Sequence, residues 1–182
     1  MIIVGGEAAR SVRNQAEAIA IGLEAGALVV ADAVEWADAV IDAEAVPPPA
    51  VCEVATMGGA PLRDVIDMLR RIPGPSDRAV AEVLLVWRLA RLIRKAPSRA
   101  RVAADALYQF SLSGIVKDQK LRAAIRAYAD CKFHPVDNHD RQANVALALS
   151  DLSEALGEFV ERSSSLLDPP DGAPLPWLAS DI

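Results

Sequence analysis

The sequence predicts an all-α fold: an irregular bundle of seven or eight helices followed by an extended, proline-rich C-terminal tail. Hydrophobic residues make up 52% of the 182 residues, yet aromatic residues make up only 4%, and alanine alone occupies 34 positions. Small unbranched side chains favour helices over strands. Apolar residues also recur at spacings of three and four, and proline or glycine interrupts them at intervals. A chain of this length can bury one core, so we predict a single helical domain over residues 1–163 and a non-helical Ser/Pro-rich tail over 164–182.

The first half of the chain contains four predicted helices. The first follows Ser11, and Gly26 stands where a C-terminal cap is expected. Asp32 opens the second, which the prolines at 47–49 end. A short third helix covers 49–57, and a fourth begins at Pro61 and ends before the "PGPS" at 73–76. The inward faces of the first two helices are expected to carry Val12, Ala16, Ile19, Leu23, Ala33, Trp36, Ala37, Val40 and Ile41.

The second half contains four more predicted helices. Ser76 is the expected N-cap of a fifth, which runs to about Ala96 and is apolar nearly all round. Ser98 is expected to cap the sixth and Asp118 the seventh. The last and longest helix is predicted over 138–163. Its packed seam is expected to consist of Val145, Leu149, Leu152, Leu156 and Phe159.

Several classes of function lack support in the sequence. The most apolar window, 79–93, carries Glu82, Arg88 and Arg91, so no membrane span is predicted. No basic residue precedes the short apolar run at the N-terminus, so we expect no secretory signal, a cytoplasmic protein and reduced thiols at Cys52 and Cys131. The glycine-rich loops and nucleophile motifs of common enzymes are missing, which favours a non-catalytic protein without a cofactor.

The stretch "DCKFHPVDNHDRQ" (130–142) gathers both histidines of the chain. Cys131, His134 and His139 are ligand types for tetrahedral zinc, and a nearby aspartate could complete the shell. The same letters also describe the end of one helix and the start of the next. Pro135 disfavours helical backbone at His134, and Asp137 or Asn138 can cap the following helix. Because the spacing matches no paired ligand motif, we interpret this stretch as a turn and predict no metal site.

Charge is segregated along the chain. Residues 1–60 hold nine acids and two bases, residues 61–130 hold seven acids and fourteen bases, and residues 131–182 hold nine acids and three bases. Residues 88–101 contain several bases and no acid, a pattern that could bind phosphate or nucleic acid. The net charge of −6 and the lack of aromatic residues between these bases make nucleic acid an unlikely partner. Two predicted helices carry acidic stripes on their outer sides, formed by Asp32, Glu35, Asp38, Asp42, Asp151, Glu154, Glu158 and Glu161.

Three interpretations of these stripes stay open. They can be solvated faces balanced by the basic middle segment. They can form a docking surface, since a field of one sign steers a basic partner. They can also hold Mg²⁺ through Glu35 with Asp38 and Glu158 with Glu161, an arrangement that resembles the all-helical nucleotide pyrophosphohydrolases and implies a Mg²⁺-dependent hydrolase. The third interpretation is the runner-up because the carboxylates lie on the solvent side of each predicted seam.

Residues 23–56 resemble the N-terminal helical hairpin of small bacterial helical proteins, which are comparable with immunity-type inhibitors that bind a toxin. The similarity is carried by Gly26, Leu28, Val34, Trp36, Ala37, Asp38, Ile41, Pro48, Pro49 and Glu53. The resemblance implies an interaction rather than a reaction. We therefore predict a non-catalytic protein-interaction domain that binds a protein partner, of basic character, through the eight carboxylates named above.

Overall fold

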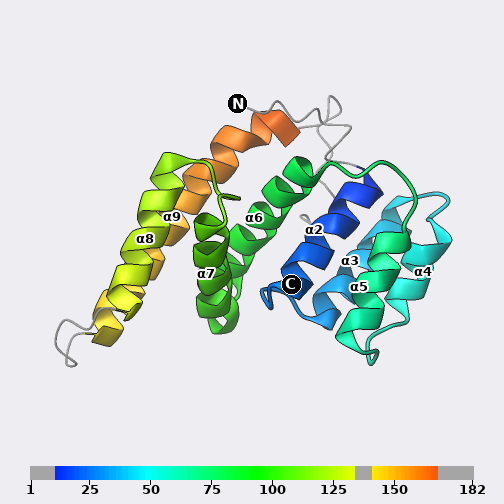
Figure 1. Ribbon diagram of the computed structural model, residues 1–182, viewed down its shortest axis with the longest axis horizontal. Coiled ribbons are helices and arrows are strands. Elements are labelled where there is room, and N and C mark those ends of the chain that lie inside the picture. The colour runs from blue at the N-terminus through cyan, green and yellow to red at the C-terminus, as the bar shows by residue number, and fades with distance from the viewer. Residues whose placement is uncertain (1–10, 134–140, 168–182) are drawn as a thin grey trace. The chain divides into compact units, whose positions relative to one another are not determined.

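The computed structural model describes residues 11–133 and 141–167, and all the secondary structure in these ranges is helical (Figure 1). This confirms the predicted all-α class. The described part of the chain contains eight helices: α2 (Val12–Glu24), α3 (Val30–Ala43), α4 (Pro49–Ala55), α5 (Leu62–Arg71), α6 (Arg78–Lys95), α7 (Pro97–Leu112), α8 (Gln119–Phe133) and α9 (Arg141–Leu167). None of them is both long enough and apolar enough to cross a lipid bilayer.

The chain divides into two compact units. Of the described residues, one unit comprises 11–85 with 165–167 and the other comprises 86–133 with 141–164, so the boundary falls inside α6. The prediction of a single helical domain over 1–163 stays a prediction. The helical residues 164–167 correct the expectation that the tail begins at 164, and the rest of that tail lies outside the described residues.

In the first unit, α2 packs against α3 and α5, and α4 packs against α3 and α5 (Figure 1). The residues at the centre are the predicted ones: Ile19, Leu23 and Trp36 are almost fully buried. Trp36 is only 1% exposed, and its indole Nε1–H donates to Oε1 of the buried Gln15 at 3.1 Å. This bond satisfies the one polar atom of the indole, which allows the largest side chain of this core to be buried without an unpaired donor.

The end of α2 shows why two glycines occur within five residues. Gly26 has a φ of +67°, a left-handed conformation that side chains with a Cβ adopt only at a cost. The Ala27 N–H donates to the Gly22 carbonyl at 2.9 Å and the Gly26 N–H to the Leu23 carbonyl at 3.0 Å, which is the Schellman pattern. Leu28 then folds back over the bare Cα of Gly22. The predicted C-cap at Gly26 is confirmed.

The second unit is built from α7, α8, α9 and the second half of α6. Leu107, Leu121 and Ile125 are fully buried where α7 packs against α8, and Trp87 of α6 donates its Nε1–H to Ser163 Oγ of α9 at 2.8 Å. The seam of α9 differs in part from the prediction, since Leu149 and Phe159 are only half-buried while Ala148 and Ala155 are buried. A straight helix repeats every 3.6 residues, so a strict seven-residue seam drifts around it over its length.

Three predicted helix starts can be compared with the structure. Asp118 caps α8 as predicted, because its Oδ1 accepts the Leu121 N–H at 2.8 Å. The prediction of Ser76 as the cap of α6 is wrong, since Asp77 Oδ1 accepts the Ala79 N–H at 2.9 Å. The prediction of Ser98 is also wrong, because α7 begins one residue earlier at Pro97, and proline suits a first position that needs no N–H.

Candidate functional site

The eight predicted carboxylates lie on two helices that belong to different units. Asp32, Glu35, Asp38 and Asp42 are on α3 in the first unit, and the other four are on α9 in the second. Their environments differ strongly, even though both sets recur at helical spacings of three and four residues. The two helices therefore need separate consideration.

Asp32 was expected to open the second helix and to lie on its solvent side, but the structure places it in a structural role. It lies in the first turn of α3, is 3% exposed, and its Oδ2 accepts the Val29 N–H at 2.7 Å. A carboxylate in that position satisfies a backbone donor at the positive end of the helix dipole. Because so little of Asp32 reaches solvent, it offers almost no surface to a partner. Glu35, one residue before the buried Trp36, is half-buried.

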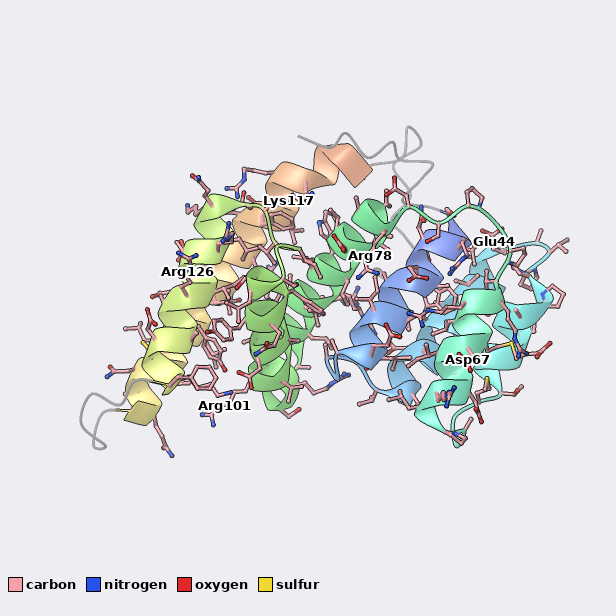
Figure 2. The ribbon with its side chains drawn as sticks, in the orientation of Figure 1. Glu44, Asp67, Arg78, Arg101, Lys117 and Arg126 are labelled. Atoms are coloured by element: carbon pink, nitrogen blue, oxygen red, sulfur yellow. The ribbon has the colours of Figure 1, made fainter. Side chains whose placement is uncertain are left out.

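The exposed carboxylates of α3 gather at its C-terminal end. Asp38 and Asp42 are exposed one turn apart on the same side of the helix. Glu44, the C-cap residue, is exposed where the chain leaves α3, as its label in Figure 2 shows. None of the three forms an ion pair with a residue in the described part of the chain. The sequence offers no local counter-charge either, because no Lys, Arg or His occurs between Arg13 and Arg63.

This position is electrostatically unfavourable for the helix itself. The last carbonyls of a helix carry partial negative charge, so an acid near them typically costs about 0.3–1 kcal/mol and a base stabilises. The last turn of α3 contains Asp42 and no base, and Glu44 follows directly. The carboxylates and the dipole add to one negative potential at this end of α3, which favours the approach of a cation.

The loop after Glu44 adds an exposed apolar side chain. Val46 is 86% exposed, which is more than any other large hydrophobic side chain in the described residues. Pro48 has φ −59° and ψ 137°, close to polyproline II, so the end of this loop is extended. The sequence contains the signal for this loop in its run of three prolines, but we interpreted that run only as a helix stop. We define the α3 docking surface as Asp38, Asp42, Glu44 and Val46.

The acidic stripe of α9 is partly neutralised within the second unit. Lys120 of α8 binds Glu158, and Arg162 contacts Glu158 at 3.5 Å and Asp118 at 3.0 Å. The hydrogen bond from Lys120 is the main cause that lowers the pKa of Glu158 below its usual value, with the charge of Arg162 adding to it. Asp151, Glu154 and Glu161 are exposed on the same helix. The α9 stripe therefore presents a weaker negative field than its sequence indicates.

The residues considered as metal ligands lie in three places: on α3, on α9, and in the stretch 130–142. Within the described ranges, no three His, Cys, Asp or Glu side chains are grouped so that they could hold a metal ion. The pair Glu35 and Asp38 belongs to the first unit and the pair Glu158 and Glu161 to the second. At the start of the stretch 130–142, α8 ends at Phe133, close to the predicted end of this helix, and Cys131 is half-buried. His134, Asp137, His139 and Asp140 lie outside the described residues.

Comparison with known proteins identified no matching family model, no similar curated protein and no similar solved structure. The residues of the α3 docking surface and their chemistry are therefore the basis for a proposal on function.

Proposed function

We propose that the protein is a non-catalytic interaction domain that binds a basic protein partner through the α3 docking surface. The observation that carries this proposal is the cluster of three exposed carboxylates, unpaired within the described residues, of which Asp42 and Glu44 lie at a helix end where they oppose folding. Acids at the C-terminal end of a helix go against the charge preference of that end, and such departures without a structural gain are expected mainly at functional sites. A cationic side chain bound at this end would offset the repulsion between these carboxylates and the negative end of the α3 dipole.

The partner chemistry follows from the same residues. Lys or Arg side chains would contact Asp38, Asp42 and Glu44, and a small apolar pocket would receive Val46. Exposed charges mainly accelerate and steer association, whereas a buried apolar anchor supplies most of the binding free energy. Residues 23–56, which resemble the hairpin of small bacterial helical proteins comparable with immunity-type inhibitors, include this whole surface. An immunity-type inhibitor in the cytoplasm, bound to a basic toxin, is the specific form of the function that we propose.

The test is affinity capture from a native extract with quantitative mass spectrometry. The bait variants are wild type, Asp38→Lys/Asp42→Lys/Glu44→Lys, and a matched control, Asp64→Lys/Asp67→Lys, which reverses two exposed carboxylates of α5 in the same unit. We expect specific basic partners to be captured by the wild type and the control and lost with the α3 variant. Partners that survive reversal of the α3 carboxylates would refute the proposal, as would a wild-type bait that captures no protein above background.

A second variant tests the apolar anchor separately. Val46→Asp leaves every carboxylate in place and removes only the exposed side chain of the loop. We expect it to increase the dissociation rate of a captured partner by about tenfold, with a smaller effect on the association rate. An unchanged dissociation rate would remove Val46 from the docking surface while leaving the carboxylates to be judged by the first experiment.

A further inference from the structure

We propose that the outer face of α8 carries a binding site for a dianionic phosphate group, supplied either as inorganic phosphate or as a phosphate monoester. A hollow of about 310 Å³ lies on this helix and is lined by Gln119, Arg122, Ala123 and Arg126. The proposal uses residues of the second unit only and does not depend on the α3 docking surface.

The spacing of the four residues explains the hollow. They stand at i, i+3, i+4 and i+7, so they share one side of α8, away from the buried Leu121 and Ile125. Ala123 has the shortest side chain of the four and is surrounded by the longer side chains of the other three. A depression above the methyl group results, and Arg122 and Arg126 are among the residues that line it.

Both arginines are available to a ligand. Arg122 is half-buried and Arg126 is exposed, and neither pairs with an acid among the described residues. The neighbouring base Lys120 differs, since it is bound to Glu158. Lys117, exposed in the segment just before α8, adds positive charge near the N-terminal end of this helix (Figure 2). The acids nearest in sequence leave both arginines available, because Asp118 binds Arg162 and Asp130 forms no ion pair with either of them.

Two guanidinium groups on one side of a helix match the geometry of phosphate. Side chains one turn apart have Cβ atoms about 5–6 Å from each other, so both planar forks can reach oxygens of the same tetrahedral group. Arginine suits this task because its donors are fixed in a plane and its charge does not titrate in the physiological range. The hollow is at the lower end of the usual size of small-molecule sites, about 300–1,000 Å³. Nucleic acid is a weaker candidate, because the lining contains no aromatic side chain on which a base could stack.

The experiment is an NMR titration of the full chain at constant ionic strength, in which the Nε–Hε signals of Arg122 and Arg126 are followed. The probes are inorganic phosphate, glycerol phosphate, acetate as a monovalent control, and a short single-stranded oligonucleotide. We expect saturable shifts with a Kd on the order of 1 mM for phosphate, for its monoester, or for both. A monoester that binds more tightly than inorganic phosphate would identify the organic ligand as the source, and the reverse order would identify the free ion.

Three variants separate the hollow from general electrostatics. Arg122→Gln/Arg126→Gln should weaken phosphate binding at least about tenfold. Ala123→Leu fills the hollow without changing charge, at an exposed position where leucine is a good helix former, and should weaken binding by a similar factor. Arg63→Gln/Arg71→Gln removes the same charge from two exposed positions of α5 and should leave affinity unchanged.

The proposal is overturned by any of four results. These are no saturable shift with the wild type, wild-type affinity in Ala123→Leu, equal weakening in the α5 control, or acetate or the oligonucleotide binding at least as tightly as phosphate. Because Ala123→Leu keeps every charge and every polar contact of the fold, its result stays decisive even if the double glutamine variant proves unstable.

Discussion

Neutralising the two carboxylates at the C-terminal end of α3 should make the protein more stable. The variant is Asp42→Asn/Glu44→Gln, which replaces each acid by its neutral isostere of similar shape and similar helix propensity. Asp42 lies in the last turn of α3, Glu44 is its C-cap residue, and neither has an ion-pair partner in the described chain. The change therefore removes an unfavourable interaction with the helix dipole and breaks no ion pair.

The expected gain follows from this geometry. One charge near a helix end contributes about 0.3–1 kcal/mol, and exposure places both residues toward the lower end of that range, so the double variant should gain about 1 kcal/mol. With a typical urea m-value of about 1–3 kcal/mol per M, the midpoint should rise by about 0.5 M. The gain should shrink in about 1 M NaCl, where the Debye length falls to about 3 Å.

The assay is urea unfolding followed by far-UV circular dichroism at low and high salt, and the control is Asp32→Asn at the other end of the same helix. Asp32 is buried and accepts the Val29 N–H, so the same chemical change there should lower the free energy of unfolding by about 1 kcal/mol. The reasoning would be refuted if both variants changed the free energy of unfolding in the same direction, or if the gain in Asp42→Asn/Glu44→Gln did not depend on salt. If the proposed function is right, the stabilised variant also binds its partner less well, a combination that partial unfolding cannot produce.

Further predictions concern packing and ionisation. Gly22→Ala should lower the free energy of unfolding by about 1–2 kcal/mol in chemical denaturation, because the new Cβ would stand 2.5 Å from an atom of the buried Leu28 and the clash outweighs the gain in helix propensity. Gly157→Ala, inside α9 with open space around its Cβ, should instead stabilise by about 1 kcal/mol in the same assay. The lowered pKa of Glu158 means that its ion pairs stabilise the fold above about pH 4.5 and are lost as the pH falls through the lowered value; ¹³C NMR titration should show this shift reduced in Lys120→Gln, and an unshifted wild-type carboxyl would contradict it. Burial, with a nearby carboxylate, raises the pKa of Tyr128, so its phenol should stay protonated in the folded protein at a pH of about 10.5, where ultraviolet absorbance would reveal an ordinary tyrosine as ionised.

Local signals in the sequence predicted most of the helical framework. Gly26 and Asp118 were placed correctly because a left-handed cap and an aspartate N-cap depend on a few neighbouring residues. The apolar face of α2 was predicted for the same reason. The N-cap of α6 was missed by one residue and that of α7 by two, since neighbouring polar residues and prolines can each begin a helix.

The candidate site could be predicted only in part, because charge spacing contains no information about distant partners. Asp32 and Asp38 follow one stripe in the sequence, but the structure buries the first, which accepts the Val29 N–H, and leaves the second exposed. Glu158 belongs to an equally regular stripe, and its partner Lys120 is 38 residues away along the chain. The hollow on α8 was missed because no single residue identifies it; it requires a short side chain placed between long ones on one side of a helix.

The two bonded indoles have a spectroscopic consequence. Trp36 emits from the first unit and Trp87 from the second, each with its N–H donated to a specific side-chain oxygen. Variants that retain one of the three tryptophans at a time would thus report on each half of the molecule independently during thermal melting. Coincident midpoints from the two emitters are the behaviour of one cooperative domain, and separated midpoints are the behaviour of two.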